Sequence, residues 1–243
     1  GVTLHLNAKI AGVGRSMRGV LMTLEDGTEI AGSHVLFATG RAPNTDKLNL
    51  AAVGLETDSR GYVPTDAKLR TKVPNLWALG DVNRRGAFTH TSYHDHEIVL
   101  ADLDKIKDRY QWKDADQRPT TYAMFTDPPL GRVGLSRTEA RKLAAEGRNI
   151  LIADMKMADI SRAKEESETT GLIRIIVDGD SEAILGATVF GIAGDEIIAI
   201  FSNFMATGAS YKIMQQALPV HPTVAELIPT ILAGLKPLAA ANA

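Results

Sequence analysis

Residues 35–44 read VLFATGRAPN, a short apolar run that leads into a Gly-Arg turn. Because residues 35–38 are all apolar, the run predicts a buried strand of a parallel α/β sheet that is covered on both faces. Open α/β sheets bind ligands at the carboxyl ends of their strands. At this end Gly40 would let a ligand or a backbone segment approach closely, and Arg41 could reach a phosphate. A plain exit from strand to loop would leave the same pattern, so both interpretations stay open.

A second segment of the same shape, LWALGDV, follows at residues 76–82. Its apolar run, residues 76–79, predicts another buried strand, which ends at Gly80 and Asp81. A carboxylate just past a strand end can accept hydrogen bonds from ribose-like hydroxyl groups. The alternative is an aspartate that only begins a turn.

Short strands are predicted before residue 35. Residues 2–6 alternate apolar and polar with a period of two, so the sequence begins as though inside a strand. The pair Asp26-Gly27 predicts a hairpin turn, because glycine accepts positive φ at little cost. The stretch GVGRSMRG at 12–19 contains Gly-x-Gly but lacks the third glycine of a dinucleotide-binding fingerprint, so it predicts a hairpin loop.

A domain boundary is predicted at residues 107–119 (KDRYQWKDADQRP), which are polar and charged. The segment before it, 96–106, carries apolar residues on one face and predicts a helix. Beyond the boundary, Ser136 and Glu139 have the spacing of a capping box at a helix start. The elements predicted there are strands at 122–125, 150–157, 172–177 and 184–190, and helices at 136–146, at 195–207 and from Thr223 onward. Strands followed by clustered helices indicate an α+β domain.

The segment VHPTVAEL at residues 220–227 places a histidine beside a helix start. Pro222 favours an extended conformation for His221, just outside the helix. Thr223 and Glu226 have capping-box spacing, which explains the segment as a helix start with a bystander histidine. The functional alternative is an imidazole beside a carboxylate, in which Glu226 fixes the tautomer of His221 for proton transfer. Glu226 cannot fully satisfy the helix N-terminus and His221 together.

Three histidines lie close together in THTSYHDHE, residues 89–97. His90 and His94 are four residues apart, so on a helix they would share a face and could bind a metal ion. The simpler explanation is a polar, solvated helix start whose N-terminus meets an anionic or carbonyl group. We therefore predict no metal site.

The composition of the 243 residues limits the function classes. The net charge is −2, with 44% apolar and 23% charged residues, and no long basic run indicates nucleic acid or an anionic membrane as a partner. No apolar stretch is long enough to span a bilayer, and the first ten residues lack the pattern of a signal peptide. The absence of cysteine excludes a disulfide framework or a cysteine nucleophile in this chain. We expect a cytoplasmic protein.

In their order and spacing, these segments resemble the class I pyridine nucleotide-disulfide oxidoreductases, which include glutathione reductase, dihydrolipoamide dehydrogenase and mercuric reductase. VLFATGRAPN looks like the end of the family's nicotinamide-binding domain, and NLWALGDV like its second flavin motif. FTDPPLGRVGLS, ILGATVFGIAGDEII and HPTVAE look like its C-terminal interface domain. The resemblance implies an α/β plus α+β fold, in which the ends of two Rossmann-like domains precede an α+β dimerisation domain. The implied bounds are 1–44 for the nicotinamide part, 45–117 for the FAD part and 118–243 for the dimerisation domain.

The resemblance also implies cofactor contacts, with FAD and NAD(P)H as cofactors. Asp81, after Gly80, would hydrogen-bond the ribityl chain of the flavin. The turn that holds Thr89 and His90 would place backbone N–H groups near the flavin ring. Gly40 and Arg41 would lie at the exit of the nicotinamide domain.

The catalytic roles that the resemblance implies belong to His221 and Glu226. His221 would protonate and deprotonate thiols of a thiol or disulfide substrate, and Glu226 would orient it. In the family this histidine reaches the disulfide of the partner subunit, so the active site requires a homodimer. The residues present identify neither the small-molecule substrate nor the choice between NADH and NADPH.

The sequence departs from the family pattern in what it lacks. The Gly-x-Gly-x-x-Gly flavin fingerprint, the glycine loop of the nicotinamide domain and the redox-active Cys-x4-Cys are all absent, so this chain cannot cycle electrons through a disulfide. We therefore expect a C-terminal fragment of an oxidoreductase. The alternative is an inactive dimerisation module. The tail GLKPLAAANA also lacks the cysteine pair of mercuric reductases, which counts against mercury as the substrate, whereas THTSYHDHE looks more like the mercuric-reductase-like branch.

Overall fold

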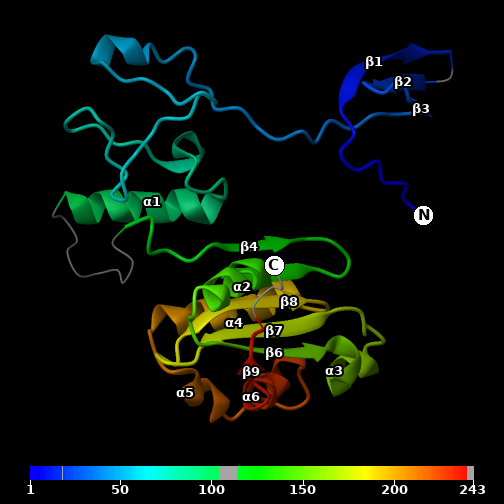
Figure 1. The fold of residues 1–243 in the computed structure, drawn as a ribbon, viewed down its shortest axis with the longest axis vertical. Coiled ribbons are helices and arrows are strands. Elements are labelled where there is room, and N and C mark those ends of the chain that lie inside the picture. The colour runs from blue at the N-terminus through cyan, green and yellow to red at the C-terminus, as the bar shows by residue number, and fades with distance from the viewer. Residues whose placement is uncertain (18, 104–113, 240–243) are drawn as a thin grey trace. The chain divides into compact units, whose positions relative to one another are not determined.

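The computed structural model describes residues 1–17, 19–103 and 114–239, and these fall into two compact units (Figure 1). The first unit is Gly1–Ala42 and the second is Pro43–Ala243. Each unit has its own sheet.

The sheet of the first unit is an antiparallel meander of β1 (Ile10–Ser16), β2 (Gly19–Leu24) and β3 (Glu29–Gly32). The predicted turn at Asp26 joins β2 to β3: Gly27 has φ of +85°, and Asp26 Oδ1 accepts the Thr28 N–H at 2.9 Å. The stretch 12–19 does form a hairpin, but the loop predicted over its whole length is wrong, because its first glycines lie within β1.

Two strands predicted for this unit are absent. Residues 2–6 and 35–38 belong to no strand, and the side chains of Leu36 and Phe37 are exposed, so the prediction of a buried strand there is wrong. The reason is that a strand needs neighbours for its backbone groups and its two faces. Among the described residues of this unit, the only sheet is the meander, which pairs with neither segment.

The second unit begins with irregular chain around a small core of Leu55, Val63 and Ala78. This irregular part includes the short 3-10 helices η1 (Leu50–Val53) and η2 (Gly80–Asn83). The strand predicted at 76–79 is wrong, because this segment makes only one isolated bridge, between Trp77 and Arg70.

Helix α1 (Thr89–Asp102) follows and begins earlier than the predicted start at His96. The first turns of the helix were not predicted because their residues are polar, and the apolar periodicity on which the prediction rests begins only at Ile98. Ile98 is buried, whereas Thr89 is exposed. The predicted helix end at Ile106 and most of the predicted boundary at 107–119 lie outside the described residues.

The main sheet of the second unit has six strands, all antiparallel, in the order β4-β5-β8-β7-β6-β9. They are β4 (Thr121–Met124), β5 (Leu130–Gly134), β6 (Ile150–Lys156), β7 (Leu172–Asp178), β8 (Ile184–Phe190) and β9 (Lys236–Pro237). The four predicted strands are confirmed, and β5 and β9 were not predicted. β5 contains two glycines, and at Gly131 a Cβ atom would lie 2.2 Å from the carbonyl oxygen of Gly194. This glycine therefore allows the start of a helix to lie directly on the strand.

Helices cover both faces of this sheet, as Figure 1 shows. Both faces need cover because β7 is apolar on each side: Ile173, Ile175 and Val177 belong to one apolar cluster, and Ile176 belongs to another. The helices are α2 (Arg137–Ala145), α3 (Ser161–Glu165), α4 (Gly194–Ala206), α5 (Tyr211–Gln215) and α6 (Ile228–Ala233), with 3-10 turns η3 (Met157–Asp159) and η4 (Val224–Leu227).

The predicted helices at 136–146 and 195–207 are confirmed as α2 and α4, and the helix from Thr223 is confirmed as η4 followed by α6. At α2 the capping box is complete: Ser136 Oγ accepts the Glu139 N–H at 3.2 Å, and Glu139 Oε2 accepts the Ser136 N–H at 2.7 Å. These hydrogen bonds lower the pKa of Glu139 below its usual range. Helix α5 was not predicted, since its five residues are too short for a periodic signal.

The division into 1–44, 45–117 and 118–243 stays a prediction. The chain separates into compact units after Ala42, and the remaining residues form one unit. Within residues 1–17, 19–103 and 114–239, none of the helices combines the length and apolar character that a bilayer crossing needs.

Candidate functional site

The turn at Gly80 and Asp81 begins η2 and presents Asp81 to the surface. Gly80 is buried with φ of +75°, and a Cβ atom there would lie 2.8 Å from Ser92 Oγ, so the position requires glycine. Its N–H donates to Asp95 Oδ2 at 2.7 Å. Asp81 is exposed in the first turn of η2. The turn therefore holds its backbone inward and leaves the Asp81 carboxylate available to a ligand.

The N-terminus of α1 lies after this turn and has no side-chain cap. The side chain of its N-cap, Phe88, cannot accept a hydrogen bond from the backbone, and Thr89 and His90 are exposed. The first N–H groups of a helix have no partner within the helix and carry its positive dipole end. The amides of Thr89 and His90 could thus donate to a carbonyl or anionic group of a ligand, as the sequence predicts.

The His90 side chain has a second role, which the sequence did not reveal. Its Nε2 lies 2.7 Å from the carbonyl oxygen of Thr121, and since a carbonyl only accepts, Nε2 donates. The His90 ring also stacks on Phe88 at 5.2 Å, and Phe88 stacks on Tyr122 at 5.9 Å. These contacts attach the start of α1 to β4.

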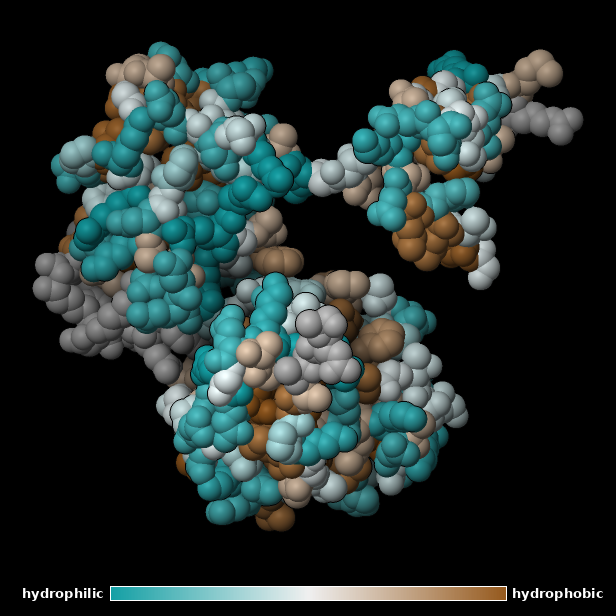
Figure 2. Space-filling view, in the orientation of Figure 1, coloured by the Kyte–Doolittle hydropathy of each residue, from teal (hydrophilic) through white to brown (hydrophobic). Residues whose placement is uncertain are grey.

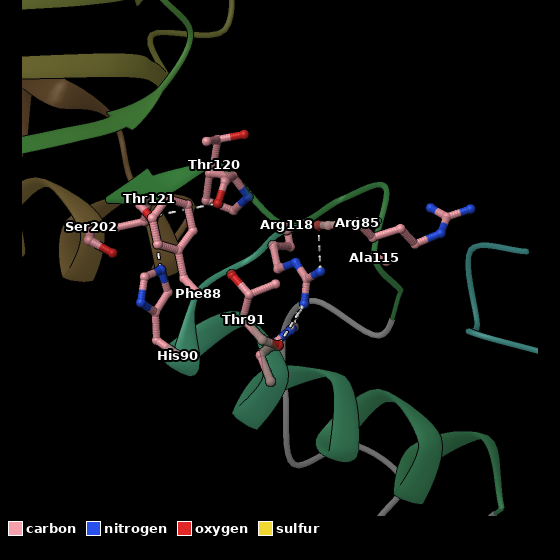
Figure 3. Close-up of a pocket in the computed structure, with 12 residues that line it drawn as sticks. Arg85, Phe88, His90, Thr91, Ala115, Arg118, Thr120, Thr121 and Ser202 are labelled. Carbon is pink, nitrogen blue, oxygen red and sulfur yellow. Dashed lines mark hydrogen bonds between the residues drawn. The ribbon is translucent and has the colours of Figure 1, made fainter. Parts of the chain in front are cut away.

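A cavity of about 380 Å³ lies between the start of α1 and the chain that leads into β4 (Figure 3). Its lining includes His90, His94, Arg118 and Ser202. Burial and the neighbouring Arg118 guanidinium lower the pKa of His94, which favours its neutral imidazole. Neutral histidines do bind metals, but among the described residues no group of three or more histidine, aspartate or glutamate side chains could hold a metal ion.

Asp95 and Arg118 form a deeply buried ion pair, and neither residue was predicted from the sequence. The side chain of Asp95 is fully buried and that of Arg118 is 11% exposed, with Nη1 donating to Oδ1 at 2.7 Å. Asp95 lies among three histidines in the sequence, and Arg118 lies in the polar stretch predicted to be a boundary. No periodic pattern in a sequence connects an acidic residue of a helix with an arginine far along the chain, so the pair could not be predicted.

His221 and Glu226 do contact each other, at the start of η4. His221 Nδ1 and Glu226 Oε2 are 2.8 Å apart. The histidine side chain is 77% exposed, whereas that of Glu226 is 11% exposed. The same Glu226 oxygen accepts the Thr223 N–H at the longer distance of 3.4 Å. The glutamate is therefore anchored at the helix start and holds an imidazole whose Nε2 faces outward.

An apolar surface adjoins the segment of His221. Ile200 on α4, Ile213 on α5 and Val220 are large apolar side chains that are 42%, 61% and 74% exposed. A hollow of about 300 Å³, lined by Ile200, Val220 and Pro229 among others, lies there. A further hollow on α4 and α5 shares Ile200 and includes Ile213. Contiguous exposed apolar surface of this kind marks a site of association.

Gly40 and Arg41 belong to the first unit, and the other predicted site residues all belong to the second. Both are exposed, and Gly40 has φ of +98°. Within the second unit, the predicted residues fall at two places: Gly80, Asp81, Thr89 and His90 surround the start of α1, and the pair of His221 and Glu226 starts η4.

Comparison with known families identifies the class of protein. Residues 1–95 match the pyridine nucleotide-disulphide oxidoreductase family, and residues 120–231 match the dimerisation domain of the same proteins. The chain belongs to the class I pyridine nucleotide-disulfide oxidoreductase family. The predicted fold class is confirmed: a partial Rossmann-like region precedes a dimerisation domain with an antiparallel sheet and helices. Proteins of this family use FAD and NAD(P)H.

Individual relatives agree with this assignment. The chain is 30% identical over 226 residues to a probable pyridine nucleotide-disulfide oxidoreductase, RclA, of Escherichia coli K12, covering 93% of this chain and 50% of that protein. It is 30% identical over 229 residues to a dihydrolipoyl dehydrogenase of Bacillus subtilis 168, covering 93% and 47%. The solved structure of the HOCl-induced flavoprotein disulfide reductase RclA from E. coli has a TM-score of 0.80 at 29% identity, covering 93% and 51%. The chain spans about half the length of the curated relatives it matches.

The contact between His221 and Glu226 makes a prediction about the neutral imidazole. Because a carboxylate only accepts, the proton should lie on Nδ1, leaving Nε2 free to accept. Long-range ¹H–¹⁵N correlation spectra of the chain should show the Nδ1–H tautomer, and Glu226→Ala should convert His221 largely to the Nε2–H form. The exposed His34, whose ring contacts Ser33, is an internal control that should not change. An Nε2–H tautomer in the unchanged chain would contradict the assigned contact.

Proposed function

We propose that this chain is the C-terminal half of an FAD-dependent NAD(P)H:disulfide oxidoreductase, in which His221 is the acid/base for a thiol or disulfide substrate. The observation that carries the proposal is the pair of His221 and Glu226, with an exposed imidazole held by a largely buried carboxylate at 2.8 Å. A bystander histidine would not need such a partner. We further propose that the protein is cytoplasmic, because the disulfide reduction that such enzymes carry out takes place in the cytoplasm.

The proton chemistry follows from which imidazole nitrogen is held. With Nδ1–H donating to Glu226, Nε2 can take a proton from a substrate thiol, and the thiolate formed is the form that attacks a disulfide. The imidazolium that results is stabilised by the Glu226 carboxylate beside it. In the reverse direction the same nitrogen returns the proton to a leaving thiolate.

The residues at the start of α1 fit part of a flavin site. The exposed Asp81 carboxylate can accept from ribityl hydroxyl groups, and the uncapped amides of Thr89 and His90 can donate to the ring carbonyl. Bound FAD would supply the relay of two electrons between NAD(P)H and a redox disulfide. Gly40 and Arg41 would belong to the NAD(P)H side, which is a proposal from family resemblance alone. The three-part division at residues 44 and 117 is proposed on the same ground.

The proposed homodimer rests on the apolar surface beside His221 and on the match of residues 120–231 to a dimerisation domain. In this proposal, the surface of one copy packs on another and so carries His221 toward the partner's redox centre. Apolar side chains as exposed as Ile213 and Val220 are stabilised when an interface removes them from water.

A second candidate function is an inactive dimerisation module. The absence of cysteine favours it for this chain by itself, because no redox disulfide can form within it. A flavin bound in stoichiometric amount, with turnover of NAD(P)H by the purified chain, would exclude this second function.

The dimer proposal predicts the mass of the chain in solution. Light scattering at tens of micromolar should give about twice the 26.1 kDa of one chain. Ile200→Asp should weaken the dimer by about 100-fold or more, because it places an unpaired charge in an apolar contact. Met17→Asp, at an exposed position of the first unit, is the matched control and should leave the dimer intact. A strictly monomeric unchanged chain would refute the proposed homodimer.

The catalytic proposal predicts separable effects on the two half-reactions of the flavoenzyme that contains this segment. His221→Ala should lower turnover with the disulfide substrate by about 100-fold or more, the usual scale for a general acid/base. Reduction of the flavin by NAD(P)H should be nearly unchanged, since in this family it takes place on the other face of the flavin. Stopped-flow absorbance of the flavin measures the two half-reactions separately.

Glu226→Ala is the companion variant, and it should reduce disulfide turnover less than His221→Ala because it orients the base without replacing it. Unchanged disulfide turnover in His221→Ala would show that the pair is only a helix start. An equal loss of flavin reduction would show that His221 is structural.

A further inference from the structure

Asp95 is a fully buried carboxylate that the proposed proton chemistry does not use. Its side chain has no exposed surface, and both oxygens are occupied. Oδ2 accepts the Gly80 N–H at 2.7 Å and Asn83 Nδ2 at 2.8 Å, while Oδ1 accepts Arg118 Nη1 at 2.7 Å. The carboxylate thus joins both ends of η2 to an arginine that precedes β4.

Arg118 makes further contacts with the backbone on the same side. Nη1 lies 3.3 Å from the carbonyl oxygen of Thr91, and Nη2 donates to that of Arg85 at 3.1 Å. One guanidinium therefore contacts α1, the loop after η2 and the buried carboxylate. Figure 3 shows Arg118 extending toward Thr91 beside the cavity.

The geometry points to Asp95 and Arg118 as positioning residues, which fix the turn of Gly80 and Asp81 relative to the start of β4. This inference rests on the proposed function in one respect, namely that the Asp81 carboxylate is the flavin contact. A buried carboxylate that loses its arginine is left with uncompensated charge, so the turn and Arg118 cannot move apart independently. Arg118 directly precedes the sheet, and the chain continues from the sheet to His221. Through this pair, the sheet therefore also fixes the position of Asp81.

The pair of Arg148 and Asp178 provides a matched comparison. Asp178 is also buried, its side chain is 7% exposed, and it is paired with an arginine. It accepts from the backbone of its own hairpin turn, including the Ser181 N–H at 2.9 Å, and contacts none of the proposed site residues in the described chain. Breaking this pair should therefore leave the Gly80 turn unchanged.

Amide hydrogen exchange of this chain, measured by NMR, tests the inference directly. Arg118→Gln should speed exchange of the Gly80 N–H by at least about 10-fold, the scale for weakening one hydrogen bond to a charged group. Arg118→Lys keeps the charge and should return the rate to within about three-fold of the unchanged chain. Arg148→Gln should leave Gly80 exchange as it is.

Asp95→Asn is the second variant, for the case that Arg118→Gln fails to fold. Its amide oxygen can still accept from Gly80, but its uncharged amide cannot hold Arg118 equally well, so Gly80 exchange should again rise by about 10-fold. The amide of Ile98, within α1, should change far less than that of Gly80. A rise of similar size at both amides would show that the pair merely stabilises the whole unit, and would overturn the inference.

Unchanged Gly80 exchange in Arg118→Gln, or failure of Arg118→Lys to restore it, would also overturn the inference. The measurement involves neither flavin nor catalysis, so its failure counts against the positioning pair alone. Failure of the proposed function would show instead in unchanged disulfide turnover of His221→Ala.

Discussion

The second unit depends on a sheet whose central strands are apolar on both faces. β7 sends Ile173 and Ile175 into one cluster and Ile176 into the other, so helices must cover both sides. α4 packs on β5 and β8, with Phe201 fully buried, and the chain then continues through α5 to the helix start that holds His221. The position of the imidazole is thus a consequence of how the sheet is covered. Figure 2 shows brown, apolar side chains between teal, hydrophilic ones on the visible face of this unit.

Two carboxylates with different tasks, one largely buried and one fully buried, organise the two parts of the candidate site. Glu226 is fixed at a helix start and leaves its imidazole partner in solvent, an arrangement suited to exchanging protons. Asp95 is closed off from water and holds backbone and guanidinium groups, an arrangement suited to keeping geometry fixed. The stacked rings of His90, Phe88 and Tyr122 add a second connection between α1 and β4. The turn of Gly80 and Asp81 and the sheet are therefore connected by both charge and packing.

The sequence predicted those parts whose signals are local. The strands β6, β7 and β8, the capping box at Ser136 and the contact between His221 and Glu226 all follow from residues close together in the chain. The prediction of a strand at 35–38 was wrong, because a parallel strand needs neighbouring strands that the described chain does not supply. Asp95 and Arg118 could not be found, because an ion pair 23 residues apart leaves no periodic trace.

The central claim is that His221 serves the redox centre of a partner subunit, and subunit mixing tests it most directly. The flavoenzyme with His221→Ala would be coexpressed with this cysteine-free chain, and the mixed dimers purified by separate affinity tags. In such a dimer, the proposal places the imidazole of this chain opposite the disulfide of the flavoenzyme subunit. The account predicts that disulfide turnover returns in the mixed dimers, and does not return when this chain also carries His221→Ala. Mixed dimers that form but stay inactive with His221 intact would contradict the account.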